Sequence, residues 1–225
     1  MIAERDLPYY KDRWKRIAKT LRGLFPHPKI ALNFSNHWEL LVAVQLSAQC
    51  TDKKVNEITP ELFKKYPTLD DYVKAGRTAR GVHGFEQAIR QTGFFRAKAK
   101  HILAAAKIVK EKFHGRLPKT MAEMVTIPGV GRKSANVILG NAYGVVEGIA
   151  VDTHVIRLSR LLGLTKERTP EKIEKDLMAI IPERDWFKAT YLLIDYGRKY
   201  CPARPHDHAK CPLTKVLGQG KLSTF

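Results

Sequence analysis

The sequence predicts an all-α fold, and two observations support this prediction. Apolar residues recur with the period of an amphipathic helix, as in residues 96–113. The apolar stripe of that segment, spaced i, i+4, i+7 and i+11, consists of Ile102, Ala106, Val109 and Phe113. No segment shows the convincing alternation of apolar and polar residues that predicts a half-buried strand. With 225 residues, 44% of them hydrophobic, the chain can bury a sizeable core in one large domain or two small lobes.

The first expected helix covers residues 38–50, which are apolar on most faces, as in a central buried helix. The amphipathic helix at 96–113 comes next among the clear patterns. Thr120, with Glu123 three residues later, forms a capping-box pattern that opens a short helix over residues 121–127.

Three more helices are expected further along the chain. Residues 132–144 have one apolar face, formed by Ala135, Ile138, Leu139 and Ala142. Asp152 fits the N-cap position of a helix over residues 153–164. A threonine cap followed by a proline at the first helical position opens the helix expected at 169–181.

The chain is strongly basic. Lys and Arg together number 40 against 22 for Asp and Glu, which gives a formal net charge of +18. Such a field favours a polyanionic partner, and nucleic acid is the leading candidate. The basic residues are spread along the chain within helical patterns, whereas a disordered basic arm would concentrate them. A basic surface that serves solubility alone is the alternative that the charge leaves open.

The sequence has no sign of a membrane span or of export. No apolar run reaches the ~18 residues that a span needs, and the charged N-terminus lacks the apolar core of a secretory signal. Three cysteines are an odd number without a disulfide framework. We therefore expect a cytoplasmic protein, and its positive charge favours association with the nucleoid. Nothing in the sequence suggests an assembly, so we expect a monomer.

A glycine-rich turn at residues 128–131 joins the helices expected at 121–127 and 132–144. Gly129 and Gly131 let the backbone approach another chain closely, and the free amides at the start of the second helix point outward. This arrangement binds anions, and in a basic protein a DNA phosphate is the natural ligand. An ordinary corner between two helices, with glycines needed for its turn, is the alternative.

Five segments resemble, in the same order, segments of bacterial endonuclease III, a family of the helix-hairpin-helix DNA glycosylase superfamily. They are residues 39–56, 92–102, 127–139, 151–158 and 195–201. One glycine hairpin is a weak signal, whereas five ordered segments are a strong one. The resemblance extends from about residue 30 into the C-terminal region.

The resemblance implies a two-lobed helical architecture. Residues 30–145 would form a six-helix lobe with the hairpin, and residues 1–29 and 146–225 a second, discontinuous lobe. DNA and an extruded base would lie in the cleft between the lobes.

The resemblance also assigns two catalytic residues, Lys133 as nucleophile and Asp152 as its acidic partner. A lysine at the positive end of a helix costs stability, and Arg132 adds a like charge beside it. Both disfavour the ammonium form, and only the neutral amine can attack the sugar. Asp152 can stabilise positive charge on the sugar and move protons, a role compatible with that of an N-cap.

Further residues are implied to contact DNA. Gln49 would enter the space that the extruded base leaves, and Phe94 would be an apolar wedge. Phenylalanine is a mild departure, because the family often has a leucine-like residue at this position. A core phenylalanine and a buried glutamine bonded to backbone are the structural alternatives. The remaining predicted DNA contacts are in the hairpin: Gly129, Val130, Gly131 and Arg132.

The C-terminal region departs from the family pattern. Relatives usually end with four cysteines, spaced C-x6-C-x2-C-x5-C, that hold a [4Fe–4S] cluster. The four positions are here Cys201, His208, Cys211 and Leu217. Because leucine cannot bind iron, we expect a lobe that folds without a cluster or any other cofactor. Zinc, held by the two cysteines and His206 or His208, is a less favoured alternative, since no fourth ligand is evident.

The sequence therefore predicts a base-excision repair enzyme with DNA glycosylase and AP lyase activities toward oxidised pyrimidines in duplex DNA. A glycosylase for uracil or mismatched thymine is the alternative within the same class. A helix-hairpin-helix module that binds DNA without catalysis is the alternative from another class.

Overall fold

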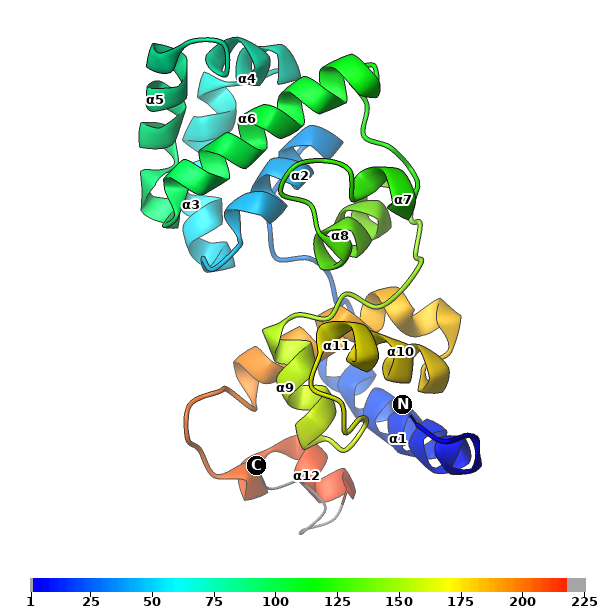
Figure 1. Cartoon of the computed structure of the whole chain (residues 1–225). Coiled ribbons are helices and arrows are strands. Elements are labelled where there is room, and N and C mark those ends of the chain that lie inside the picture. The colour runs from blue at the N-terminus through cyan, green and yellow to red at the C-terminus, as the bar shows by residue number, and fades with distance from the viewer. Residues whose placement is uncertain (1, 218–225) are drawn as a thin grey trace. The chain divides into compact units, whose positions relative to one another are not determined.

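The structure is a computed structural model that describes residues 2–217. These residues form α-helices and short 3-10 helices, and no β-strand occurs among them (Figure 1). The prediction of an all-α fold is confirmed. No helix within the described range is both long and apolar enough to cross a membrane.

The contacts divide the chain into two units. The first comprises Met1–Ile30 and Val146–Phe225, and the second comprises Ala31–Val145. That these units are separate domains on either side of a DNA-binding cleft stays a prediction.

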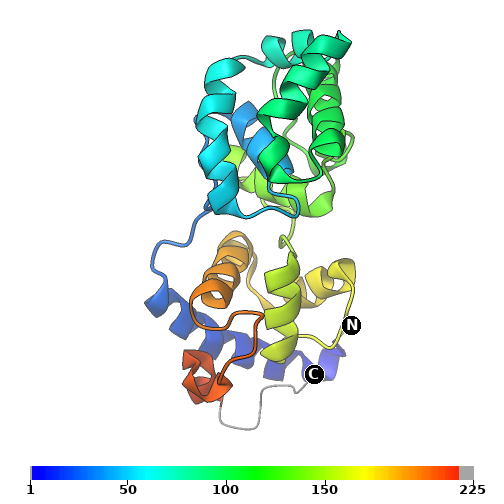
Figure 2. The ribbon, with the colours of Figure 1, turned by 90° about the vertical axis from the view of Figure 1, so that its left-hand side faces the viewer.

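The second unit is built around the buried helix α2. Its helices are α2 (His37–Leu46), α3 (Asp52–Lys65), α4 (Leu69–Ala75), α5 (Ala79–Ala88), α6 (Phe95–Lys112), α7 (Met121–Met124) and α8 (Arg132–Tyr143). Helix α2 packs against α3, α6 and α8, and α6 lies along α4 and α5 (Figures 1 and 2). Seven successive side chains of α2, from Leu40 to Leu46, are buried, as expected for a central helix. The helix ends at Leu46, four residues earlier than expected.

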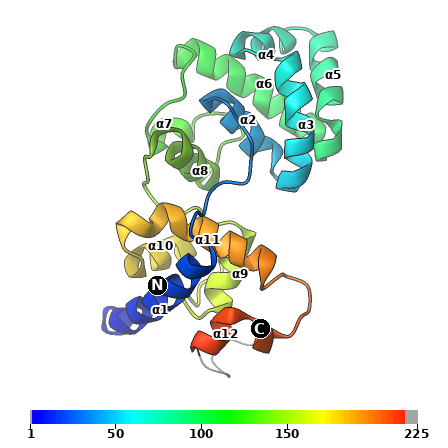
Figure 3. The same cartoon turned by 180° about the vertical axis from the view of Figure 1, so that it is seen from behind.

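An apolar core holds the helices of the first unit together. Its helices are α1 (Leu7–Leu24), α9 (Thr153–Leu161), α10 (Pro170–Ile180), α11 (Trp186–Lys199) and α12 (Pro212–Leu217). Helix α1 contacts α10, α11 and α12 (Figure 3). Trp14, Ile17 and Leu21 of α1 meet Leu158, Leu177 and Leu193 of the other helices in this core. The buried side chains of α1 thus pack the N-terminal segment of the unit against its C-terminal segment.

Local capping follows the sequence with two differences. Thr120 accepts a hydrogen bond from Glu123 N, but the helix that it opens ends at Met124, before the expected residue 127. Thr169 occupies the N-cap position before Pro170, but its side chain makes no capping hydrogen bond.

The glycine turn between α7 and α8 packs tightly on α2. Gly129 has a φ of +79°, a conformation that L side chains rarely adopt. A Cβ atom there would lie 2.8 Å from His101 Cβ and 2.9 Å from Gln45 Oε1. Gln45 Nε2 donates a 2.9 Å hydrogen bond to Pro128 O, so the turn is bonded to the buried helix as well as packed against it. A Cβ at Gly131, by contrast, would meet no atom within 4 Å.

We expect Gly129→Ala to lower the free energy of unfolding by roughly 2–4 kcal/mol, because it combines a strained φ with overpacking against Gln45 and His101. Gly131→Ala is the matched control, with a φ of −90° and open space around the new methyl group. Urea unfolding followed by circular dichroism measures both. Equal stability of the two variants would contradict the packing described for Gly129.

Candidate functional site

The hairpin of the second unit exposes its basic residues at the start of α8. Gly131 is the N-cap residue, and Arg132 and Lys133 are the first two residues of the helix, both exposed. Six successive residues of α8, from Ala135 to Gly140, are buried, which fixes the helix in the unit. The free amides of the first turn and the backbone of Lys133 thus belong to one fixed helix. The side chain of Val130 is only 5% exposed, so a DNA contact there would involve its backbone.

Asp152 belongs to the first unit and caps α9. Its Oδ1 accepts a 2.8 Å hydrogen bond from Val155 N, which confirms the N-cap role. Its Oδ2 lies 3.4 Å from His154 Nδ1, and the Asp152 side chain is 20% exposed. The capping bond fixes the direction of the carboxylate, a requirement for an acid–base group.

Gln49 and Phe94, the two residues expected to enter the duplex, share an uncommon backbone conformation. Both are exposed and have positive φ, 51° and 46° respectively. Phe94 is 66% exposed, whereas Phe95 is partly buried. Phe94 is therefore not a core residue. A non-glycine residue in this region of φ is held there by its surroundings and often marks a functional segment.

A buried lysine links the segments that carry Gln49 and Phe94. Lys98 is 6% exposed, and its Nζ donates 2.8 Å hydrogen bonds to Leu46 O and Thr92 O. Leu46 is the last residue of α2, and Thr92 precedes the turn at Phe94. Burial lowers the pKa of Lys98. The ammonium group fastens both segments to α6.

Sequence reasoning missed Lys98 and Gln45, although each has a visible signal. Lys98 stands four residues before Ile102, on the buried stripe of its helix, where a cation needs acceptors. Gln45 is the one amide in an otherwise apolar stretch of α2, and a buried amide needs a partner such as Pro128 O.

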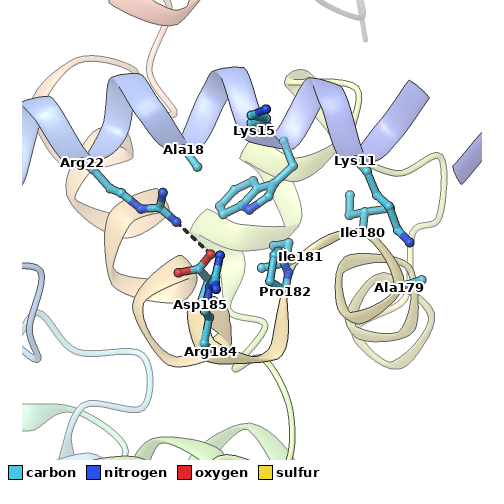
Figure 4. A pocket seen from close by; sticks show the side chains of 11 residues that line it. Lys11, Lys15, Ala18, Arg22, Ala179, Ile180, Ile181, Pro182, Arg184 and Asp185 are labelled. Carbon is cyan, nitrogen blue, oxygen red and sulfur yellow. Dashed lines mark hydrogen bonds and ion pairs between the residues drawn. The ribbon is translucent and has the colours of Figure 1, made fainter. Parts of the chain in front are cut away.

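The first unit has a basic pocket of about 490 Å³ between α1 and the segment that follows α10. Figure 4 shows Lys11, Lys15 and Arg22 on α1, with the ion pair from Arg22 Nη2 to Asp185 Oδ2 at 2.8 Å. Its lining has none of the predicted catalytic residues, so this pocket is not the expected active site.

Four potential metal ligands converge after α11, in the segment that leads to α12 (orange to red in Figure 1). We call Cys201, His206, His208 and Cys211 the Cys/His group. One ligand atom from each lies within 4.8 Å of all the others. The prediction that this region has no metal or cofactor is therefore wrong. The sequence spacing matched no common module, so the fourth ligand became evident only in three dimensions.

The Cys/His group does not provide the ligands of a [4Fe–4S] cluster with four thiolates. It contains two thiols, and the fourth family position, Leu217, is 3% exposed in the apolar core of the unit. Burial raises the pKa of the Cys211 thiol to about 11.

Comparison with known proteins agrees with the fold and the hairpin. The profile of the "HhH-GPD superfamily base excision DNA repair protein" family matches residues 42–183. Endonuclease III of Synechocystis is 42% identical over 97% of this chain and 98% of its own length. Endonuclease III of Bacillus subtilis is also 42% identical, over 88% of each chain. A solved structure of a trapped endonuclease III–DNA covalent intermediate has 37% identity and a TM-score of 0.83, covering 96% of both chains.

The chain therefore belongs to the HhH-GPD superfamily of base excision DNA repair proteins and, within it, to the endonuclease III family. Membership of this family confirms the prediction of a base-excision repair enzyme, a DNA glycosylase with AP lyase activity on double-stranded DNA. The uracil or thymine glycosylase and the non-catalytic module are not favoured.

We expect Lys98→Met to lower the free energy of unfolding by roughly 2–4 kcal/mol, because two buried carbonyl groups lose their donor. Hydrogen exchange should also become faster at residues 46–50 and 92–95. Lys100→Met, at an exposed position of the same helix, is the control and should change neither quantity. Unchanged exchange in Lys98→Met would contradict the role of Lys98 as a link between these segments.

The same pair of proteins gives a pH dependence with a defined sign. Because the pKa of Lys98 is lower in the folded than in the unfolded chain, the unfolded chain holds this proton to higher pH. The free energy of unfolding of the wild type, relative to that of Lys98→Met, should therefore increase with pH. The increase should occur between the lowered pKa of Lys98 in the folded chain and the pKa of an ordinary lysine. Urea unfolding at a series of alkaline pH values measures this difference in free energy of unfolding. A difference that stays constant or decreases with pH would contradict the lowered pKa.

Proposed function

We propose that the protein removes oxidised pyrimidines from duplex DNA and cuts the strand with Lys133 as nucleophile and Asp152 as acid–base partner. The observation that carries the proposal is an exposed lysine in the first turn of α8, directly after the glycine hairpin, in a member of the endonuclease III family. A relative at 37% identity is described as trapped in a covalent intermediate with DNA, which supports a covalent step here.

Lys133 would act through its neutral amine. Attack of Nζ on C1′ of the damaged nucleoside forms a C–N bond while the C1′–base bond breaks, and the base leaves with its bonding electron pair. The sugar ring then opens as the C1′–O4′ bond breaks. The two protons of the attacking amine pass to the departing base and to O4′, which leaves a Schiff base between Nζ and C1′. Removal of a C2′ proton then expels the 3′ phosphate, which cuts the strand on the 3′ side of the lesion.

Asp152 would stabilise the positive charge that develops on the sugar as the base leaves. Its carboxylate can also accept and return protons during the later steps. The bond from Val155 N to Oδ1 supports this role, because it orients the group. The N-cap and the catalytic role use the same carboxylate.

The hairpin and the two exposed loop residues would hold the DNA. Amides beside Gly131 offer donors to a backbone phosphate, and open space around its Cα permits close approach. Phe94 would enter the base stack and Gln49 would occupy the space left by the extruded base. Their exposure and their positive φ support both roles.

The proposal has two further parts. The protein would act in the cytoplasm in association with the nucleoid, as its charge of +18 favours. Its C-terminal Cys/His group would hold a metal other than a four-iron, four-thiolate cluster, since only two thiolate ligands are available there.

Lys133→Gln should abolish strand cutting at an abasic site while leaving DNA binding within a few fold of the wild type. Lys107→Gln removes one positive charge at another exposed position and is the matched control. Gel assays on duplexes with thymine glycol or an abasic site measure cutting, and fluorescence anisotropy measures binding. Strand cutting by Lys133→Gln at the wild-type rate would overturn the assignment of the nucleophile.

Asp152 can be tested with its capping role held constant. Asparagine caps helices about as well as aspartate, so Asp152→Asn should keep the wild-type melting temperature but lose roughly 100-fold or more in base release. Asp152→Ala should lose the same activity and, in addition, roughly 1 kcal/mol of stability. Single-turnover base release and thermal unfolding separate the two effects. If Asp152→Asn releases the base at the wild-type rate, Asp152 caps α9 and has no catalytic role.

A further inference from the structure

We propose that the Cys/His group binds one zinc ion in a closed tetrahedral site of two thiolates and two imidazoles. The site lies in the segment between α11 and α12 of the first unit. It has no part in the glycosylase or lyase chemistry proposed above, so either proposal can fail without the other.

The distances between the ligand atoms fit a single ion. Cys211 Sγ is 3.3 Å from His206 Nε2 and 4.0 Å from His208 Nδ1, and Cys201 Sγ is 3.7 Å from the same Nδ1. Around a tetrahedral zinc ion with bonds of ~2.3 Å to sulfur and ~2.0 Å to nitrogen, sulfur and nitrogen lie roughly 3.5 Å apart. The three measured separations lie on either side of this value.

The same distances disfavour an iron–sulfur cluster. In a four-iron cluster each ligand binds a different iron, so the ligand atoms are held apart by the whole cluster. In a two-iron cluster with two cysteines and two histidines, the ligands divide into pairs on separate irons. Four ligand atoms that all lie within 4.8 Å of one another leave no room for either cluster between them.

The hydrogen bond on the far side of His206 prepares its ring for metal binding. His206 Nδ1 lies 2.9 Å from the carbonyl oxygen of Arg204, which accepts a hydrogen bond only if Nδ1 carries the proton. In the neutral ring with this tautomer Nε2 has the free lone pair, and Nε2 is the nitrogen that faces Cys211 Sγ. Zinc-binding histidines commonly donate their other N–H to a backbone carbonyl in this way.

The sulfur atoms are shielded from solvent, as in a structural site, and a guanidinium group lies beside one of them. Cys201 and Cys211 are 1% and 3% exposed, and Arg157 Nη1 lies 3.7 Å from Cys201 Sγ. Arg157 also donates a hydrogen bond to Cys201 O, so a guanidinium group is fixed beside the sulfur. Zinc and nitrogen–sulfur ligands are well matched, and four protein ligands leave no position for water or substrate.

A zinc ion here would stabilise the end of the fold. Cys201 follows the end of α11 by two residues and Cys211 directly precedes α12, so the ion would cross-link the loop that connects the two helices. Helix α12 buries Leu213 and Leu217 in the core around α1. Metal binding that closes this loop therefore adds to the stability of the first unit.

Metal content of the full-length protein is the direct test. The protein would be expressed in medium that contains both iron and zinc, purified without added metal, and measured by inductively coupled plasma mass spectrometry and a sulfide assay. We expect one zinc per chain, little iron and no acid-labile sulfide. X-ray absorption at the zinc edge should give two sulfur neighbours at ~2.3 Å and two nitrogen neighbours at ~2.0 Å.

Ligand variants identify the residues that bind the ion. Cys211→Ser and His206→Gln should lose zinc at chelator concentrations that leave the wild type fully loaded. The loss in zinc affinity should exceed the ~10–100-fold that is typical when only a hydrogen bond to a metal ligand is removed. Cys50→Ser and His83→Gln change the same residue types outside the group and should retain zinc. If Cys211→Ser fails to fold, the partly exposed His206 still provides the test.

Three results would contradict the zinc site. Four irons with sulfide, or two irons with two sulfides, would replace the zinc site with a cluster. Purified wild type without stoichiometric metal that also fails to take up added Zn²⁺ would overturn the site altogether. Full zinc retention by both ligand variants would place the ion elsewhere. None of these readouts depends on DNA glycosylase activity.

Discussion

Contact between the glycine turn and the buried helix α2 is the constraint on which the start of α8, and with it the proposed DNA-binding hairpin of the second unit, depends. Gly129 has no room for a Cβ against Gln45 and His101, and Gln45 Nε2 holds Pro128 O at 2.9 Å. Because α8 begins directly after this turn, the position of its first residues depends on the packing of the turn against the buried Gln45 and against His101. Lys133, the proposed nucleophile in that first turn, therefore starts from a fixed backbone.

Buried polar groups have the same organising role elsewhere in the chain. The ammonium group of Lys98 joins the end of α2 to the segment before Phe94, so two exposed residues with positive φ are supported by one buried cation. Asp152 places a carboxylate at the start of α9 with a capping bond. In each case a hydrogen bond that the fold requires also positions a group that repair of DNA would use.

Much of the fold could be predicted from local patterns, because helical periodicity and caps are encoded within a few residues. The buried helix before Gln49 and the hairpin at Gly129 are examples. Contacts between distant segments could not be predicted in this way. The bond from Gln45 to Pro128 joins residues 83 positions apart, and the convergence of His206 with Cys211 depends on how a loop folds back. The expectation of a metal-free C-terminal region failed for that reason.

Lys133 is proposed to form a covalent bond with the sugar of the damaged nucleotide. Borohydride reduction during reaction with a duplex containing an abasic site, followed by proteolysis and mass spectrometry of the adduct, tests it most directly. We expect one adduct per chain, on the peptide that contains Lys133, and none with Lys133→Gln. An adduct on another lysine or on the N-terminal amine, or the absence of any adduct from folded protein, would contradict it.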